Sequence, residues 1–269
     1  FDSVKTTGTL SAGTVFTSSV NDVEFQFVPI TDFTASNTGS QISFLNVPIY
    51  EGTFVTTRIT VDADDVSQRF VIPDNRADTN TLIVEVENSS ADSTATTYIK
   101  TTDISQVTST SANYFIQEVE NGKHEIYFGD GVIGKGLSDG NVVVMTYVVT
   151  NGTSANTAAA FTNAAVIDTV IDVSVSTVSA ASGGAVAESI NSIKFNAPLT
   201  FASQGRCVTA DDYTTFVKRF FPNTQAVSIF GGETGSFDDT VGVVSTPEYG
   251  KVFISVKSTT GNNLTDSEK

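Results

Sequence analysis

Short segments of alternating or β-branched residues, each followed by turn residues, recur through residues 1–150. Residues 23–28 and 81–87 have the two-residue period of a half-buried strand, and no segment of convincing length in this half has a helical period. Regularly spaced short strands are typical of antiparallel sandwiches and barrels. We therefore predict a mainly β protein of the α+β class that folds into several lobes. Its N-terminal modules should be antiparallel and resemble sandwiches or barrels. The other strands expected in this half cover residues 54–61, 96–100, 114–118, 124–128 and 142–149.

The balance of charge limits the partners of the chain. Its 269 residues hold 14 Lys and Arg against 30 Asp and Glu, a formal net charge of −16 with the lone histidine neutral. Nucleic acids and anionic membranes would be repelled by such a surface, so neither is expected as a partner. No apolar run has the length of a membrane span, and the single cysteine, Cys207, cannot form an internal disulfide. The fold is therefore expected to hold by burial alone.

Residues 151–184 differ from the rest because they are rich in Ala, Ser, Thr and Asn and contain no Lys or Arg. Within them, residues 169–178 alternate as a strand would. The segment is either a link between two lobes or an extended arm that pairs with another sheet edge. We therefore expect a β-rich region over 1–150, which can hold two modules with a boundary near 88–113, then a connector with one strand, then an α+β domain over 185–269.

Helical patterns begin after residue 184. Residues 185–195 fit a helix that ends before Pro198. Thr209 is a favourable N-cap for a second helix, because its hydroxyl can accept from the first turn. The rest of this second helix is also well specified: Asp211 and Asp212 complement the dipole, Tyr213, Phe216, Val217 and Phe220 share one face, and Pro222 ends it.

The last part of the chain combines two expected strands, at 225–230 and 251–257, with a glycine-rich acidic loop between them. Near the end, Thr265 is followed three residues later by Glu268, which is the capping-box signature of a helix start. Together with a first residue that is not methionine, this predicts that the chain is a piece of a longer protein and that the α+β domain is truncated.

A glycine-rich stretch over residues 129–136 satisfies G-x-G-x-x-G and comes close to a phosphate-binding loop. Such a loop needs Ser or Thr after its lysine and a helix behind it, whereas Lys135 is followed by Gly136 and then by an expected strand. A dinucleotide site fails for the same lack of a helix. We therefore expect a glycine-shaped hairpin between two strands and no cofactor.

Catalytic arrangements have little support. His124 is expected to be exposed near a turn, and Cys207 to be a small buried residue. The acidic candidates for a catalytic pair or a calcium site are Asp62, Asp64, Asp65, Asp238 and Asp239. They are best explained as solvated turn residues. The segment over residues 62–65 also lacks the glycine and the distal glutamate of a calcium-binding loop. No catalytic, cofactor-binding or metal-binding residue is therefore predicted.

Two stretches resemble baseplate proteins of contractile bacteriophage tails, namely the baseplate J-like family and the related wedge proteins of T4-like phages. The first is the family's F-G-D-G-x-x-G hairpin, and the second is a segment in which A-P and then R-x-V-T lead into a helix that begins with D-Y. The matching residues are Phe128, Gly129, Asp130, Gly131 and Gly134, then Pro198, Arg206, Val208, Thr209, Asp212 and Tyr213. The resemblance covers residues 114–231, and residues 1–113 carry no matching motif.

The resemblance implies a C-terminal fragment of a structural subunit of the tail baseplate wedge, located in the virion and not an enzyme. It implies a homodimer that links neighbouring wedges into a ring, contacts other wedge proteins and rearranges as the sheath contracts. Both motifs make sense as structural elements, because glycines allow tight turns and Thr209 caps a helix.

Alternatives to this function remain open from the residues alone. One is a receptor-binding or tail-fibre-like β module, which Ser/Thr-rich strands would also suit. The other is a glycosidase with an acidic pair, which would need two facing carboxylates about 5–10 Å apart. For self-association the candidate residues are Phe220 and Phe221, because one of the two can face the core while the other points outward.

Overall fold

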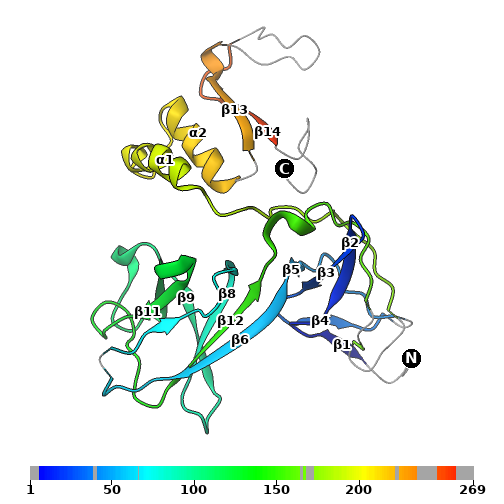
Figure 1. Cartoon of the computed structure of the whole chain (residues 1–269), viewed down its shortest axis with the longest axis vertical. Helices are drawn as coiled ribbons and strands as arrows, with labels where there is room; N and C mark the ends of the chain where they lie inside the picture. The colour runs from blue at the N-terminus through cyan, green and yellow to red at the C-terminus, as the bar shows by residue number, and fades with distance from the viewer. Residues whose placement is uncertain are drawn as a thin grey trace. The chain divides into compact units, whose positions relative to one another are not determined.

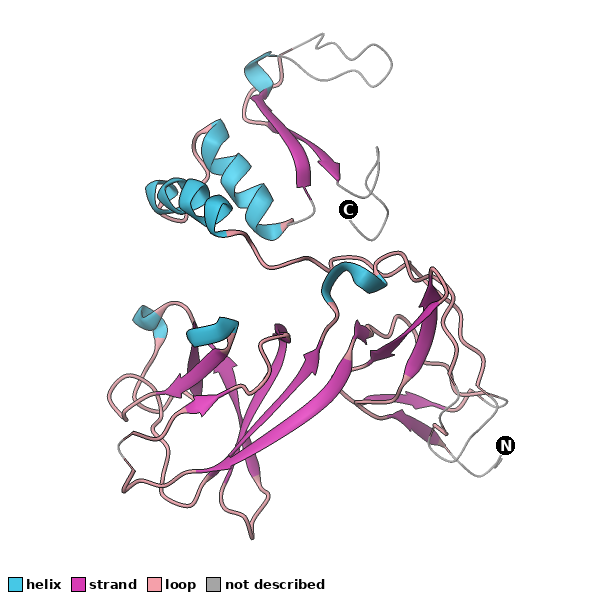
Figure 2. Cartoon of the chain, viewed as in Figure 1, coloured by secondary structure: helices cyan, strands magenta, loops and turns pink. Residues whose placement is uncertain are grey.

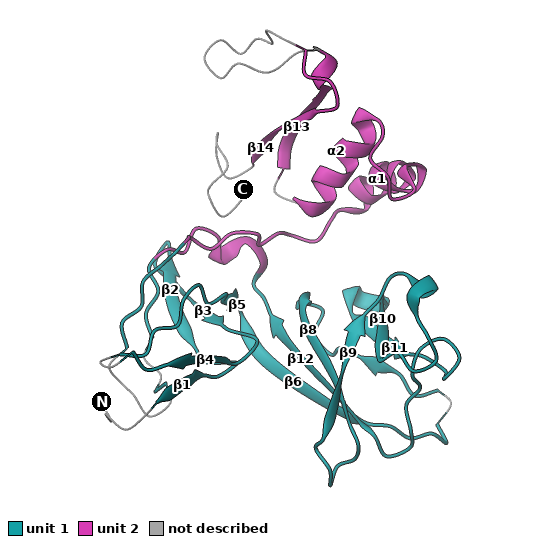
Figure 3. Cartoon of the chain, turned by 180° about the vertical axis from the view of Figure 1, so that it is seen from behind, with its two compact units in different colours: residues 1–151, 160–178 teal, residues 152–159, 179–269 magenta. Residues whose placement is uncertain are grey.

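The computed structural model describes residues 6–38, 41–65, 67–163, 166–167, 173–221, 224–234 and 247–258. The chain divides into two compact units (Figure 3). Unit 1 comprises residues 1–151 and 160–178, and unit 2 comprises residues 152–159 and 179–269. The class of the fold is as predicted, since strands dominate and the long helices lie in the C-terminal part (Figure 2).

A seven-stranded sheet forms most of unit 1. Its strands are β6 (Thr53–Thr60), β7 (Phe70–Val71), β8 (Ala77–Glu87), β9 (Ala95–Lys100), β10 (Asn113–Glu118), β11 (His124–Phe128) and β12 (Val142–Val149). They lie in the order β6-β12-β8-β9-β10-β11-β7. All neighbours are antiparallel except β9 and β10, which pair in parallel. The sheet curls into a near-closed barrel-like form (Figure 1).

The inner face of this sheet carries the main core of unit 1. On β12 the inward residues are Val143, Met145 and Tyr147, each at most 1% exposed. Rings from other strands complete the core, and Phe128 meets Phe70 and Tyr98 edge to face with centroids 5.5 and 5.2 Å apart. Continuous burial along β12 explains its almost unbroken apolar sequence.

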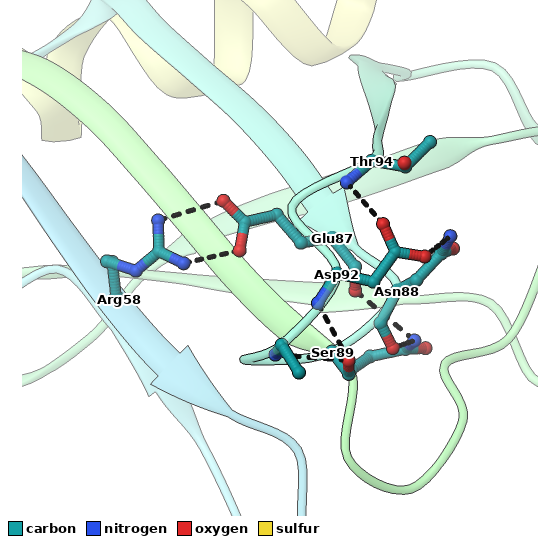
Figure 4. A network of polar contacts seen from close by, with 8 residues as sticks. Arg58, Glu87, Asn88, Ser89, Asp92 and Thr94 are labelled. Atoms are coloured by element: carbon teal, nitrogen blue, oxygen red, sulfur yellow. Dashed lines mark hydrogen bonds and ion pairs between the residues drawn. The ribbon is translucent and has the colours of Figure 1, made fainter.

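An ion pair crosses β12 on the outer face of the same sheet. Arg58 on β6 is the register partner of Val144, and Glu87 on β8 is the register partner of Val142. Arg58 Nη1 donates to Glu87 Oε1 at 2.9 Å, and the second guanidinium nitrogen donates to the other carboxylate oxygen (Figure 4). Val142 and Val144 are 3% and 7% exposed, so the bidentate pair lies on a strand that is buried on both faces.

The turn that follows Glu87 is also closely hydrogen-bonded. Asp92 accepts from the Asn88 side chain at 2.8 Å and from the Thr94 N–H at 3.0 Å (Figure 4). Asn141, just before β12, donates to the carbonyl oxygens of Glu87 and Asn88 at 3.3 and 3.0 Å. The β8–β9 turn and the start of β12 are therefore held together by side chains.

Two smaller sheets complete unit 1. The first contains β2 (Phe16–Val20), β3 (Val23–Val28) and β5 (Tyr50–Glu51), and the second pairs β1 (Thr7–Leu10) with β4 (Phe33–Ser36). The backbones of Thr17 and Thr162 exchange two hydrogen bonds of 2.9 Å, and Phe27 packs edge to face on Phe161 at 4.9 Å. Residues 161–162 thus return to the edge of β2.

All seven strands predicted for this half are present, whereas five others were missed. The missed strands are β1, β2, β4, β5 and β7, each no longer than five residues and so too short for an alternating pattern to stand out. The strand predicted over 169–178 was wrong for residues 173–178, which have no strand, and residues 168–172 lie outside the described part. Pairing with a sheet edge occurs earlier, at Thr162.

Unit 2 contains α1 (Ile190–Ser203), α2 (Ala210–Phe220), β13 (Thr224–Gly231) and β14 (Val252–Ser258). Helices α1 and α2 pack on each other, α2 packs on β13, and β13 pairs with β14. Short 3₁₀ turns lie at Gly152–Ala155 and Gly232–Thr234 here, and at Ile104–Gln106 and Glu120–Gly122 in unit 1. Helix α2 and both strands lie where the sequence predicts them.

The helix predicted over 185–195 was wrong at both ends. Helix α1 begins later because Ser189 is its N-cap and accepts from the N–H of Ser192 at 3.2 Å. It also continues through Pro198, and the next turn is held by Thr200, whose hydroxyl donates to the carbonyl of Asn196 at 3.0 Å. It ends where Gln204 adopts a left-handed conformation.

Glu125 gives unit 1 a pH-dependent contact. Arg69 donates to its two oxygens at 2.6 and 2.7 Å, and Gln117 donates at 3.1 Å. These bonds, that from Arg69 foremost, hold the pKa of Glu125 below its usual range although burial opposes the shift. A lowered folded-state pKa means that the stabilisation is present above the unfolded-state pKa and is lost as pH falls through the folded-state pKa.

We therefore expect Glu125→Gln to lower the free energy of unfolding of unit 1 by about 1–2 kcal/mol at neutral pH. The deficit should shrink as the pH falls below about 4, where the wild-type carboxylate loses its charge. Urea unfolding followed by circular dichroism between pH 3 and 7 measures both. Glu118→Gln, at an exposed position of the adjacent strand β10, is the control. An equal loss for Glu125→Gln at every pH would contradict the assignment.

Candidate functional site

The glycine-rich stretch is a crossing loop and not a hairpin. Strand β11 ends at Phe128 and β12 begins at Val142, but β10, β9 and β8 lie between these two strands in the sheet. The predicted hairpin was therefore wrong, because the chain traverses one end of the barrel-like sheet instead of reversing beside itself. The local turn within residues 129–134 is nevertheless tight.

Asp130 organises this turn. Its Oδ1 accepts from the backbone N–H groups of Val132 and Ile133, both at 2.9 Å, and these bonds hold the pKa of Asp130 below its usual range. The N–H of Gly131 donates to the carbonyl of Gly134 at 3.0 Å. With its carboxylate used to cap its own loop, Asp130 has a structural role.

The glycines of the loop are required by close backbone approach. A Cβ at Gly129 would lie 2.3 Å from the carbonyl oxygen of Ile133, and Gly131 and Gly134 have φ of +85° and +87°. Gly134 also donates to the carbonyl of Thr108 at 3.1 Å, which ties the turn to the preceding loop. The turn is thus fixed both internally and to its neighbour.

The tip of this rigid turn presents apolar side chains to solvent. Val132 is 73% exposed and Ile133 is 47% exposed. They are not among the candidates expected from the sequence, although two β-branched residues between glycines in a loop are poorly placed for burial. No helix follows the turn, so it lacks the N-terminus that a phosphate site needs.

The second motif forms the start of α2. Asp212 Oδ2 accepts from the N–H groups of Thr209 and Val208 at 2.8 and 3.1 Å, and Thr209 Oγ1 accepts from the N–H of Asp212 at 3.2 Å. This is a reciprocal capping box, and its backbone bonds lower the pKa of Asp212. Arg206 donates to Gln204 Oε1 at 3.0 Å, and Pro198 lies within α1.

An apolar groove of about 320 Å³ lies between α2 and β14. Helix α2 contributes its whole apolar face, and β14 contributes two side chains that the sequence analysis did not single out. The lining residues are Tyr213, Phe216, Val217, Phe220, Phe221, Ile254 and Val256. Phe220 is 73% exposed, whereas Phe221 is half-buried, so Phe220 is the outward-facing member of the predicted pair.

The remaining acidic candidates that the structure describes lie in turns. Oδ1 of Asp62 accepts from the N–H of Asp64 at 3.0 Å, and Asp65 accepts from the N–H and hydroxyl of Ser67 at 2.9 and 2.6 Å. Asp64 is exposed, and Asp238 and Asp239 lie outside the described residues, as does the predicted capping box at 265–268.

Two expectations about reactive side chains were wrong. Cys207 is exposed instead of buried, because it lies in the open turn between α1 and α2. His124 is half-buried instead of exposed, because β11 is flanked by β10 and β7, and its Nδ1 is enclosed without a hydrogen-bond partner.

The described residues hold no group of three or more His, Cys, Asp or Glu placed to bind a metal ion. They also include no helix with the length and apolar character needed to cross a membrane.

The chain is similar to structural proteins of phage baseplates. Residues 209–269, which begin at the N-cap of α2, match the family described as baseplate structural protein gp6, C-terminal domain I. The baseplate wedge protein gp6 of Enterobacteria phage T4 is 29% identical to the chain in an alignment of 257 positions that covers 84% of the chain. The chain spans 37% of the length of that relative. These findings confirm the resemblance to phage baseplate wedge proteins that the two motifs indicate.

The tight turn at Gly129 gives a prediction about the first motif. Gly129→Ala should lower the free energy of unfolding of unit 1 by about 3 kcal/mol, because the new methyl group would collide with backbone atoms that cannot rotate away. Gly136→Ala is the matched control, since its Cβ would meet no atom closer than 3.4 Å. Thermal unfolding of the two variants measures the difference. Equal stability would show that the loop relaxes freely.

Proposed function

We propose that this chain is a structural subunit of the baseplate wedge of a contractile phage tail, assembled in the host cytoplasm and carried in the virion. The observation that carries the proposal is the similarity to the T4 wedge protein. It extends over 84% of the chain, which is more than either unit alone contains, so it includes parts of both units.

Within this proposal, the chain links neighbouring wedges into a ring by self-association as a homodimer and by contacts with other wedge proteins. It also takes part in the rearrangement of the baseplate as the sheath contracts. The motif residues then serve as structural elements, since Asp130 and Asp212 each cap backbone N–H groups of their own segment. The chain has no catalytic role in this account.

Exposed apolar side chains on rigid frames support a role in protein–protein contact. Such side chains are rarely clustered on a soluble monomer without an interaction to serve. Unit 1 presents Val132 and Ile133 on the turn capped by Asp130, and unit 2 presents Phe220 at the end of α2. Each unit thus has a candidate contact surface of its own.

Co-assembly tests the role as a wedge subunit. The purified chain, mixed with the other wedge proteins of the phage that encodes it, should co-elute with at least one of them in size-exclusion chromatography. Failure to bind any of them, together with binding to a glycan receptor, would instead favour a receptor-binding module.

Self-association gives a separate prediction. In sedimentation equilibrium the chain should have twice its monomer mass of 28.4 kDa. Phe220→Asp should shift it to the monomer, because a carboxylate in an apolar contact is costly to desolvate.

Val132→Asp places the same change at an equally exposed site in unit 1 and should leave the dimer intact. A dimer that survives Phe220→Asp but dissociates with Val132→Asp would move the contact to the loop of unit 1. A wild-type monomer at high concentration would contradict the homodimer.

A further inference from the structure

Strand β6 is a long edge strand of the seven-stranded sheet (Figure 1). It pairs with β12 over all eight of its residues in an unshifted register, whereas β7, at the other edge, has two residues. Edge strands are commonly protected against further pairing by charge, proline, a bulge or short length. Strand β6 has no proline, and its one charged side chain, Arg58, is bound to Glu87 across β12. It therefore keeps the features that permit another strand to pair with it.

The outward backbone groups of β6 are open to a further strand. The N–H of Val61 donates to the carbonyl of Asn141 at 2.8 Å, so the odd-numbered residues of β6 bond to β12. The even-numbered residues point the other way, and the last of them is used, because the carbonyl of Thr60 accepts from Gln68 Nε2 at 2.7 Å. Within the described part of the chain, the backbone groups of the other three have no hydrogen-bond partner. These residues are Phe54, Thr56 and Arg58.

The core beneath β6 is also incompletely covered. Val55 and Ile59 pack against the main core but are only half-buried, whereas Val143, Met145 and Tyr147 on the neighbouring strand are at most 1% exposed. Apolar side chains on a further strand would cover both, since cross-strand neighbours on one face lie about 5 Å apart. The backbone and the core of this edge are therefore complemented by the same object, a strand with alternating apolar residues.

The C-terminal end of β6 gives this edge a negative charge. Gln68 occupies the position beside Thr60 that an added strand would otherwise take, and its Oε1 accepts from the N–H of Asp62 at 3.0 Å. The turn that starts here therefore lies on the open side of β6. It carries Asp62, Asp64 and Asp65, which we call the acidic turn. A basic group at the adjacent end of an added strand would be attracted to it.

A second copy of this chain fits the edge less well than a basic partner. Antiparallel pairing of two β6 strands about Thr56 or Thr57 would bring the acidic turn of each copy beside Glu51 of the other. Like charges in neighbouring cross-strand positions are destabilising. The charge of the edge therefore favours an extended segment of a different protein, with Lys or Arg at the end that meets the acidic turn.

We propose that β6 is a docking site for an extended segment of another protein, which adds an antiparallel strand opposite residues 54–58. Its apolar residues face the core beside Val55 and Ile59, and its basic N-terminal end lies at the acidic turn. The antiparallel direction is the more stable one per residue. That such a partner exists rests on the proposed role in assembly, but a synthetic peptide tests the site without any wedge protein, so the two proposals can fail separately.

Hydrogen exchange locates the added strand. The probe is the end-blocked peptide K-K-V-T-V-T-V-T, whose valines would face the core. In the free chain the amides of Phe54, Thr56 and Arg58 should exchange faster than those of Val55 and Thr57, which bond to β12. The peptide should slow exchange at the first three by at least about tenfold and leave the other two unchanged. NMR on the full chain resolves each amide, and unchanged exchange at the first three overturns the proposal.

Two N-methylated peptides separate strand addition from attraction by charge or apolar area alone. A methyl group on the nitrogen of the middle threonine removes an N–H that donates to β6, so binding should weaken at least about fivefold. A methyl group on the nitrogen of the following valine removes an N–H that points away from β6, so binding should be nearly unchanged. Fluorescence anisotropy of labelled peptides measures both affinities. Equal affinities overturn the proposal.

Asp64→Lys tests the charged end of the site. This change in the acidic turn should weaken binding of the lysine peptide at least about threefold at low salt. Glu118→Lys makes the same change of net charge at an exposed position of β10 and should have little effect. Equal affinities of the two variants overturn the basic-ended partner. Slower exchange of the same three amides at higher protein concentration, without peptide, also overturns it, because a second copy would then be the occupant.

Discussion

Strand β12 packs between β6 and β8 with buried side chains on both of its faces. A strand in this position cannot present charged groups on either side, which explains its almost unbroken run of apolar residues. The inner face supplies Val143, Met145 and Tyr147 to the core, and on the outer face the ion pair of Arg58 and Glu87 crosses the strand beside Val142 and Val144. Because β6 lies at the edge of the sheet, β12 is the strand that joins it to β8 and the rest of the sheet.

The features that the sequence predicts well are those with strong local signals. Strand β12 was predicted at its observed bounds because apolar and β-branched residues run through it without interruption. Helix α2 was predicted because Thr209 is a favourable N-cap, Asp211 and Asp212 complement the helix dipole, and four apolar residues share one face. In both cases the local pattern and the tertiary environment favour the same structure.

Features set by contacts distant in sequence were missed or misplaced. The hairpin expected after Phe128 is a crossing loop because three strands from elsewhere lie between β11 and β12. The bounds of α1 were misplaced for a local reason instead, because Ser189 caps the helix and Pro198 does not end it. At the candidate site, the motif residues of α2 were visible in the sequence, but the contribution of Ile254 and Val256 required the pairing of β13 with β14.

The two carboxylates of the motifs, Asp130 and Asp212, perform the same physical task in different units: each accepts backbone N–H groups of its own segment. This arrangement produces rigid surfaces rather than reactive groups. Rigid units with exposed apolar positions are suited to an assembly whose contacts are made at defined points. Such surfaces fit the proposed role in assembly, and the chain is similar to a baseplate wedge protein.

The most direct measurement of this central claim is immunoelectron microscopy of intact and contracted tails of the phage that encodes the chain, with an antibody raised against unit 1. A wedge subunit predicts label at the baseplate in both states, in a ring around the tail axis. Label confined to the tips of fibres, or absent from purified tails, would contradict a role in the baseplate wedge.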